Sequence, residues 1–249
     1  MGYTWHWKVL FETEPGGTGT YLNYLIVGLG WTLATALAAW VIALVIGAVV
    51  GTVRTTQSKW AVRLGNLYVE IFRNIPLIVQ MFLWFFVMPE LLPKALGDWI
   101  KQMPPPWSSY IPAVMCLGIF TSVRVAEQVR AGINSLPRGQ RMASVATGLT
   151  EVQAYRYVIL PQAFRIILPP LTSEFMNIIK NSSVALTIGL LELTGRARAM
   201  QEFSFRVFEA FTAATVIYLL TNLLVVLAMR ALEKKVRVPG LISMQSGGH

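Results

Sequence analysis

The stretch Gln140–Pro161, with the sequence QRMASVATGLTEVQAYRYVILP, decides how the rest of the chain is organised. It is the longest polar and basic interval between hydrophobic runs, and it ends in Ile159-Leu160-Pro161. Five arginines lie within it or close to it: Arg130, Arg138, Arg141, Arg156 and Arg165. The chain on both sides is apolar over lengths typical of membrane spans. The stretch therefore indicates a water-exposed segment between two spans.

The composition places the chain among integral membrane proteins. Of its 249 residues, 55% are hydrophobic and only 13% are charged, whereas a soluble domain averages about 25% charged residues. The net charge of +9 is explained by positive loops between spans, which orient a membrane protein, and it predicts no nucleic-acid partner. We expect a single all-α integral membrane domain over residues 1–249, in contact with membrane lipid.

The residues that catalysis or metal binding would need are nearly absent. The only histidines, His6 and His249, are terminal, and the single cysteine, Cys116, lies in an apolar run, as a core residue does. The sequence has no phosphate-binding loop of the GxxxxGKS or GxxxxGKT type and no HExxH or GxSxG motif. We therefore expect no enzyme activity, no metal site and no cofactor. The first residues contain Glu12 and Glu14 and no apolar core, so we expect the first span to act as its own insertion signal.

Five apolar runs are long enough to cross a bilayer, whose hydrocarbon core needs about 20 helical residues. The runs cover residues 22–53, 67–88, 111–131, 166–190 and 210–229. The polar interval 132–165 lies between the third run and the fourth. We therefore predict five transmembrane helices, with this interval as the most prominent loop.

The distribution of lysine and arginine predicts the orientation of these spans. The 54–66 loop, the 130–165 interval and the C-terminal tail share one side and hold twelve lysines and arginines. The N-terminal tail and the 89–110 and 191–209 connections share the other side and hold six. Because cytoplasmic loops carry the excess of positive charge, we expect the N-terminus in the periplasm, and the C-terminus and the 132–165 interval in the cytoplasm.

Ionisable residues inside spans are costly, at about 2.5–3.5 kcal/mol each on insertion scales. The predicted spans contain six of them: Glu70, Arg73, Arg124, Glu127, Glu174 and Lys180. Glu70 with Arg73, and Arg124 with Glu127, are three residues apart, so each pair shares one helix face and is able to form an ion pair. Such pairs either stabilise packing near the cytoplasmic membrane boundary or serve the function of the spans.

The fourth run is polar in its middle. Glu174, Asn177 and Asn181 recur at helical spacing and share a stripe, which in a lipid-embedded helix must face protein or water. Two interpretations stay open: hydrogen bonding between helices, or the wall of a polar pathway. Pro169-Pro170 disrupts backbone hydrogen bonding before the stripe and is a possible kink.

The opening stretch resembles the cytoplasmic "EAA" loop of permease subunits in bacterial ATP-binding-cassette importers. The pattern of that loop is Glu-Ala-Ala, three residues, Gly, nine residues and Ile-x-Leu-Pro. Four positions of this chain fit it: Ala143, Gly148, Leu160 and Pro161. Val158 takes the Ile position, whereas Met142 stands in place of the Glu and Ser144 in place of the second Ala. Because that Glu commonly helps hold the loop, another contact must replace it here.

Two further stretches resemble signatures of the polar amino-acid branch of the same family. One is Glu70–Gln80, EIFRNIPLIVQ, and the other runs from Leu168-Pro169-Pro170 to Lys180-Asn181-Ser182-Ser183. Together with the five-span layout, they make the whole chain most similar to the glutamate/aspartate permeases of the histidine-permease subfamily. The resemblance implies the type I importer transmembrane fold and a place in the bacterial inner membrane.

The resemblance also implies partners and site residues. The expected partners are two ATPase subunits, a second permease subunit that is identical or paralogous, and a periplasmic amino-acid-binding protein. The expected ATPase-coupling residues are Ala143, Val145, Gly148, Leu149, Leu160 and Pro161, on short helices across the membrane direction, with a sharp turn at Gly148 and Pro161 helping to end the segment. Val145, Leu149, Val152 and Tyr155 are expected to fill a groove on the ATPase. The expected substrate pathway for an acidic amino acid comprises Arg124, Glu174, Lys180, Asn181 and Ser182, of which Arg124 and Lys180 meet the substrate carboxylates.

Three other functions stay open at this point. The substrate is alternatively another polar amino acid. The chain is alternatively a secondary transporter or channel subunit that works without ATP, although it is short for that and has no evident inverted repeat. A purely structural membrane protein is the third alternative, against which the polar stripe in the fourth run argues.

Overall fold

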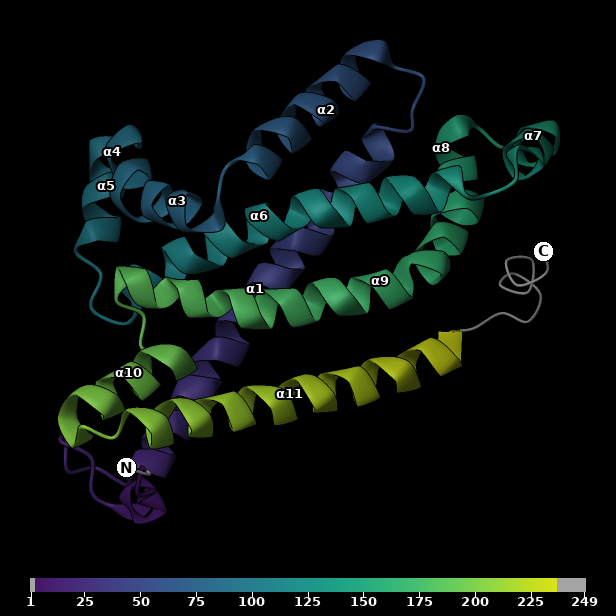
Figure 1. Cartoon of the computed structure of the whole chain (residues 1–249). Coiled ribbons are helices and arrows are strands. Elements are labelled where there is room, and N and C mark those ends of the chain that lie inside the picture. Colours follow the sequence, from purple (N-terminus) through teal and green to yellow (C-terminus); the bar gives the residue numbers. More distant parts are fainter. Residues whose placement is uncertain (1–2, 237–249) are drawn as a thin grey trace.

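The structure is a computed structural model that describes residues 3–236 and is almost entirely helical (Figure 1). Three long helices lie one beside the next: α6 (Trp107–Asn134), α9 (Leu160–Asn181) and α11 (Val207–Val236). A fourth, α1 (Tyr21–Val53), crosses them obliquely and makes its most extensive contacts with α6. The shorter elements are η1 (Trp7–Phe11), α2 (Lys59–Asn74), α3 (Leu77–Phe82), η2 (Leu83–Val87), α4 (Met88–Leu91), α5 (Lys94–Lys101), α7 (Arg138–Ala146), α8 (Glu151–Ala154), η3 (Tyr155–Ile159), η4 (Ser182–Ile188) and α10 (Leu193–Ser204).

Small residues allow α1 and α6 to approach closely. A Cβ atom at Gly47 would lie 2.5 Å from the Cβ of Val125, and one at Gly51 would lie 2.6 Å from the carbonyl oxygen of Ala126. On the facing helix, a Cβ at Gly118 would lie 2.8 Å from Ile42. Close backbone contact of this kind is how helices gain packing energy in lipid, where burial of apolar surface gives no advantage. The α1–α6 pair is therefore the centre of the bundle.

Within residues 3–236, three helices are long and apolar enough to cross a membrane: α1, α6 and α11. The pair formed by α2 and the α3–α4 segment makes a possible fourth span, bent by 101°. Helix α9, which carries most of the expected 166–190 span, is not among them, because its middle is polar. The all-α membrane fold predicted from the sequence is confirmed, whereas the orientation of the spans stays a prediction.

The expected span 67–88 is not one straight helix. Its break falls at Ile75-Pro76, where Ile75 is extended, with φ −98° and ψ 125°, as a residue before proline tends to be. The amide of Gln80 donates to the carbonyl oxygens of Phe72 (2.8 Å) and Ile75 (3.0 Å) at this corner. A buried side chain therefore supplies hydrogen bonds that the broken helix cannot make for itself.

The 132–165 interval is also more helical than expected. Helix α6 continues to Asn134, and α8, η3 and α9 follow one another without a gap from Glu151 to Asn181. The helix that carries the expected 166–190 span thus begins before residue 166, and it continues through Pro169 and Pro170. The part of the interval outside these helices consists of α7 and two short connections.

Candidate coupling segment and charged cavities

The coupling segment, residues 138–161, turns sharply at Gly148. Gly148 has a φ of +90°, a conformation that glycine adopts without the strain a side chain would bring. Its N–H donates to the carbonyl of Val145 (2.9 Å), and the N–H of Leu149 donates to that of Ser144 (3.2 Å). This pair of bonds is the Schellman pattern, which closes the end of a helix. The predicted turn between two short helices at Gly148 is confirmed.

A capping box starts the second short helix. The Oγ1 atom of Thr150 accepts from the N–H of Gln153 (3.3 Å), and the side-chain oxygen of Gln153 accepts from the N–H of Thr150 (2.9 Å). We expected Pro161 to help end the segment, and this expectation is wrong. Pro161 lies in the first turn of α9, where the missing N–H of proline costs little.

The six predicted coupling residues are accessible to different degrees. Ala143, Val145, Gly148 and Pro161 are exposed, whereas Leu149 and Leu160 are half-buried. Met142, which replaces the glutamate of the loop pattern, is 72% exposed. The outer surface of α7 and its turn is therefore open to a partner, and Met142 is part of that surface.

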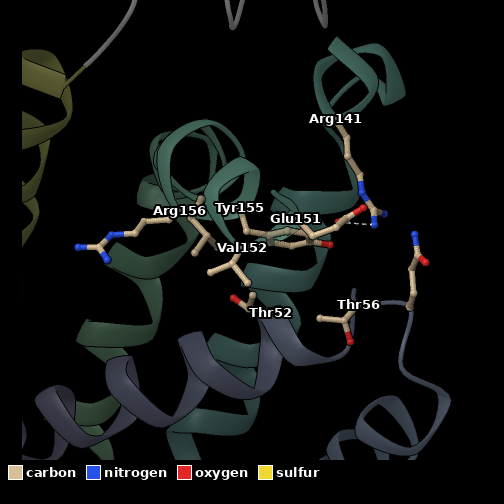
Figure 2. Close-up of a pocket in the computed structure, with 9 residues that line it drawn as sticks. Thr52, Thr56, Arg141, Glu151, Val152, Tyr155 and Arg156 are labelled. Carbon is tan, nitrogen blue, oxygen red and sulfur yellow. Dashed lines mark hydrogen bonds and ion pairs between the residues drawn. The ribbon is translucent and has the colours of Figure 1, made fainter. Parts of the chain in front are cut away.

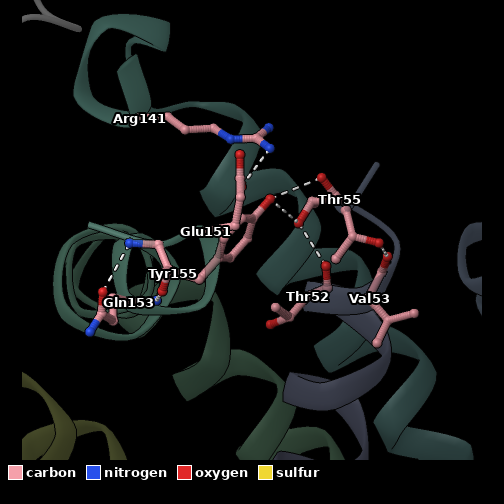
Figure 3. A network of polar contacts seen from close by, with 9 residues as sticks. Thr52, Val53, Thr55, Arg141, Glu151, Gln153 and Tyr155 are labelled. Carbon is pink, nitrogen blue, oxygen red and sulfur yellow. Dashed lines mark hydrogen bonds and ion pairs between the residues drawn. The ribbon is translucent and has the colours of Figure 1, made fainter. Parts of the chain in front are cut away.

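Tyr155 points inward, so the groove-filling role expected for it is wrong (Figure 3). Its hydroxyl donates to the carbonyl oxygen of Thr55 (2.9 Å) and lies 3.3 Å from the hydroxyl of the same residue. Arg141 forms an ion pair with Glu151 (2.7 Å) and lies over the Tyr155 ring, 5.7 Å from its centre. The Arg141–Glu151 pair links α7 to α8 and is a contact of the kind expected to replace the missing glutamate. Tyr155 fastens the segment to the end of α1.

Two cavities flank this network. The first has a volume of about 440 Å³ and is mainly apolar (Figure 2). It is lined by Thr52, Thr56, Gln57, Arg141, Glu151, Val152, Tyr155, Arg156 and Leu160. The second, of about 870 Å³, includes the exposed Met142 and Val145 of α7. The coupling segment thus leaves open space beside the bundle, and the polar network around Tyr155 attaches it together with the buried side chains of Ala154 and Ile159.

The charged residues of the spans pair between helices and not within them. Arg124 on α6 lies 3.6 Å from Glu174 on α9, and Arg54 at the end of α1 lies 3.0 Å from Glu127 on α6. The expected Arg124–Glu127 pair is therefore replaced by two others. Glu70 and Arg73 line one cavity, but within residues 3–236 they form no ion pair with each other.

Arg124 and Glu174 share a cavity of about 590 Å³ between α2, α6 and α9. Its lining is Phe72, Arg73, Phe120, Val123, Arg124, Glu127, Gln128 and Glu174. Glu174 is half-buried, and its Oε2 has no hydrogen-bond partner in the described part of the chain. Because 3.6 Å is too long for a good hydrogen bond, both the guanidinium and the carboxylate keep bonding capacity for a guest.

The other three predicted pathway residues lie apart from this cavity. Lys180 is exposed, Asn181 is half-buried, and Ser182 is fully buried. The Ser182 hydroxyl donates to the carbonyl of Ile179 (2.7 Å), one turn back in its own helix. The structure thus brings together Arg124 and Glu174 and leaves the Lys180–Ser182 group at the far end of α9.

Sequence reasoning missed two polar residues that join elements. Arg54 is buried and also donates from Nε to Asn66 on α2 (2.8 Å). Arg54 is the first charged residue after a long apolar run, and this position is the only feature of the sequence that could have identified it. Glu192 is fully buried and caps α10, accepting from the amide of Gly195 (2.8 Å) and the hydroxyl of Tyr218 (2.8 Å). Nothing in the local sequence distinguishes Glu192 from an exposed loop glutamate.

Known proteins agree with this architecture. The family model described as "Binding-protein-dependent transport system inner membrane component" matches residues 43–238. The glutamate/aspartate import permease protein GltJ of Escherichia coli K12 is 47% identical over 241 residues, which are 96% of this chain and 98% of GltJ. The probable glutamine ABC transporter permease protein GlnM of Bacillus subtilis is 32% identical, over 82% of this chain and 89% of its own length.

Solved structures agree as well. The crystal structure of an amino acid ABC transporter with histidines superposes with a TM-score of 0.72 at 30% identity, covering 86% of this chain and 95% of that one. The MetNI methionine ABC transporter, in an inward-facing conformation, has the same fold, with a TM-score of 0.70 at 20% identity over 91% of this chain. The chain therefore belongs to the family of binding-protein-dependent transport system inner membrane components, as a multi-pass permease of the inner membrane.

Proposed function

We propose that this chain is the permease subunit of an ATP-driven, binding-protein-dependent importer of an acidic amino acid, glutamate or aspartate. The observation that carries the proposal is the cavity of about 590 Å³ that Arg73, Arg124, Glu127 and Glu174 line, with Arg124 lying 3.6 Å from Glu174. The 47% identity to a glutamate/aspartate import permease over nearly the whole chain supports the same substrate class.

The chemistry of this cavity suits a dicarboxylic amino acid. A planar guanidinium holds a carboxylate through two parallel hydrogen bonds, and two arginines line the cavity. The unpartnered Oε2 of Glu174 is an acceptor for the ammonium group of the same substrate. Because Arg124 and Glu174 are only loosely paired, at 3.6 Å, a substrate that binds both replaces a weak contact with two stronger ones.

The coupling segment supports the ATP-driven part of the proposal. Its outer surface is exposed at Ala143, Val145 and Gly148, and two ATPase subunits, one for each of two permease subunits, would dock there from the cytoplasm. A periplasmic binding protein would deliver the amino acid from the opposite side. The excess of lysine and arginine in the loops of the coupling side supports this orientation. The chain itself then needs no catalytic residue.

Uptake by vesicles tests the substrate class. Arg124→Gln is expected to weaken transport of glutamate by about tenfold to hundredfold in apparent affinity, since a hydrogen bond to a charged group is worth about 1.5–3 kcal/mol. Neutral amino acids should be affected less. Lys180→Gln is the matched variant, because Lys180 lies outside the cavity; a larger loss there than at Arg124 would contradict the assignment of the cavity.

Copurification tests the coupling role. Gly148→Asp is expected to leave the permease inserted but to uncouple ATP hydrolysis from uptake. An ATPase subunit should copurify with the wild type and be lost when the 140–161 loop is altered. If uptake were normal in the Gly148 variant, or if no ATPase were associated with the wild type, a secondary transporter would be the better assignment.

A second substrate class follows from one relative. The Bacillus subtilis permease named for glutamine is 32% identical over most of both chains, and Gln128 contributes an amide to the same cavity. A competition panel separates the classes: unlabelled aspartate should suppress glutamate uptake more strongly than glutamine does. The reverse order would assign a neutral polar amino acid.

A further inference from the structure

A second charged cavity, of about 480 Å³, lies at the cytoplasmic-loop end of α1, where α1 meets α2 and α6. It shares Arg73 and Glu127 with the cavity proposed for the substrate but extends away from Arg124 and Glu174. Its lining is Arg54, Asn66, Val69, Glu70, Arg73, Asn74, Glu127 and Arg130. Apart from Arg73 and Glu127, the proposed import function uses none of these residues.

The inner wall of the cavity is a buried guanidinium with spare hydrogen-bonding capacity. The Arg54 side chain is 5% exposed. Its Nη2 pairs with Glu127 (3.0 Å) and its Nε donates to Asn66 (2.8 Å), whereas its Nη1 has no partner among the described residues. Gly65 makes room for it, since a Cβ there would lie 2.6 Å from the Arg54 Cγ. A buried donor without an acceptor is costly, so the site is built for an acceptor that comes from outside the chain.

The charge of the cavity selects an anion. Arg73 and Arg130 line it together with Arg54, and within residues 3–236 neither of the two forms an ion pair. Of the two carboxylates, Glu127 is already paired with Arg54, and Glu70 is exposed at the rim. Guanidinium groups hold phosphate oxygens in a bidentate geometry, and three arginines line this cavity.

The surface of α2 indicates that the anion has a hydrophobic tail. Four large apolar residues form a stripe along α2 at helical spacing and are strongly exposed: Trp60 at 73%, Leu64 at 66%, Leu67 at 53% and Ile71 at 46%. Helix α2 lies on the outside of the bundle (Figure 1), and its opposite side carries the Asn66, Val69 and Arg73 of the cavity. A helix with an apolar face and an opposite basic face is typical of contact with an anionic lipid surface.

We propose that this cavity binds the phosphate group of an anionic phospholipid, with Arg54, Arg73 and Arg130 around the phosphate and the acyl chains in the bilayer that the apolar face of α2 contacts. Basic pockets between transmembrane helices on the cytoplasmic side bind lipid head groups in this way. The bound lipid would join α1, α2 and α6 at the corner next to the coupling segment.

Native mass spectrometry of the importer complex, purified in mild detergent, tests the proposal. The wild type should retain phosphatidylglycerol in preference to zwitterionic phosphatidylethanolamine when both are supplied equally. Arg130→Gln should lower that retention about fivefold, since one arginine near anionic lipid is worth about 1 kcal/mol, and Arg130→Lys should restore much of it. Arg63→Gln is the matched control, because Arg63 is an exposed arginine on α2 that stacks over Trp60 outside the cavity.

Each other outcome overturns the proposal. Equal retention of the two lipids by the wild type would mean that no anionic lipid site exists, even if the Arg130 variants failed to fold. Equal losses from Arg130→Gln and Arg63→Gln would indicate surface charge only. A thermal shift of the delipidated complex with inorganic phosphate but not with phosphatidylglycerol would assign a free anion. A shift with glutamate instead would make the cavity part of the substrate route. The uptake assays test the proposed function separately, so their outcome does not depend on any of these results.

Discussion

Replacing Tyr155 by Phe removes one attachment of the coupling segment and leaves its packing in place. The Tyr155 hydroxyl donates to the Thr55 carbonyl (2.9 Å) and lies 3.3 Å from the Thr55 hydroxyl, whereas the ring supports Arg141 from 5.7 Å. Phenylalanine keeps the ring and loses both polar contacts. The variant therefore isolates the link between the segment and the end of α1.

The size of the effect follows from the two contacts. A neutral hydrogen bond contributes about 0.5–1.5 kcal/mol net, and the longer contact is the weaker of the two. We expect Tyr155→Phe to weaken docking of the segment by about 1–2 kcal/mol, which is a factor of about 5–30 in the ratio of docked to undocked segment. Thr55→Val removes the hydroxyl contact at 3.3 Å and the bond from the Thr55 hydroxyl to the Thr52 carbonyl (2.7 Å), but it keeps the Thr55 carbonyl that accepts from Tyr155, so its effect on the segment should be smaller.

Hydrogen exchange of residues 138–154 in the reconstituted complex measures how often the coupling segment is undocked. The ratio of amino acid imported to ATP hydrolysed measures how undocking affects the coupling of the two. Tyr155→Phe should lower both the protection of this segment and that ratio, with Thr55→Val between it and the wild type. Tyr157→Phe is the matched control, since Tyr157 is 62% exposed and only two residues away. If the Tyr155 and Tyr157 variants behaved alike, the network of Figure 3 would not be what attaches the coupling segment.

Three further predictions concern single positions. Gly148→Ala should cost about 1–2 kcal/mol of local stability, because φ is +90° there. Hydrogen exchange of the Leu149 amide measures this loss. Gly139→Ala is the control and should be neutral or stabilising, because its new Cβ would lie in open space. Gly65→Ala should displace the Arg54 side chain, because the new Cβ would lie 2.6 Å from the Arg54 Cγ. The thermal unfolding midpoint should therefore fall. An unchanged midpoint would show that the Arg54–Glu127 pair adapts freely. The N-terminal loop should lose stability in acid, because hydrogen bonds from the Thr18 side chain and the Gly16 amide lower the pKa of Glu14 from its ordinary 4.5. This contribution is full above that pH and is lost as the pH falls through the lowered value. The exchange protection factors of residues 14–18, taken relative to the intrinsic exchange rate at each pH, should fall accordingly, and Glu14→Gln should remove this dependence.

The sequence predicted those features that local chemistry determines. The apolar runs identified α1, α6 and α11, since each run has enough apolar residues to cross a bilayer. Gly148 identified the turn between α7 and α8, because glycine adopts a positive φ at little cost. Pro76 lies inside the expected span 67–88, which the sequence predicted as one helix, and the 101° bend there depends on packing that no local pattern contains.

For the charged site, the sequence predicted which residues take part but not how they pair. Arg124, Glu127 and Glu174 were recognised as costly residues within spans, and all three line the same cavity. Their partners were not predictable, since residues three apart on one helix indicate a possible pair, whereas the pairs observed run between α1 and α6 and between α6 and α9. Close contacts such as that of Gly47 with Val125 determine which helices meet and at which residues along their length. These contacts form only when the chain is folded.

The gap-free run of helix from Glu151 to Asn181 gives the molecule a mechanical property. At about 1.5 Å per residue, roughly 35 Å of helix run from Glu151 at the coupling end to Glu174 beside Arg124. The run is not straight, since it passes through the π-helical turn η3 and past Pro161, Pro169 and Pro170, where long helices bend, and Figure 1 shows it curving between α8 and α9. A movement of the coupling end is therefore passed to the Arg124–Glu174 pair along one unbroken but curved helix.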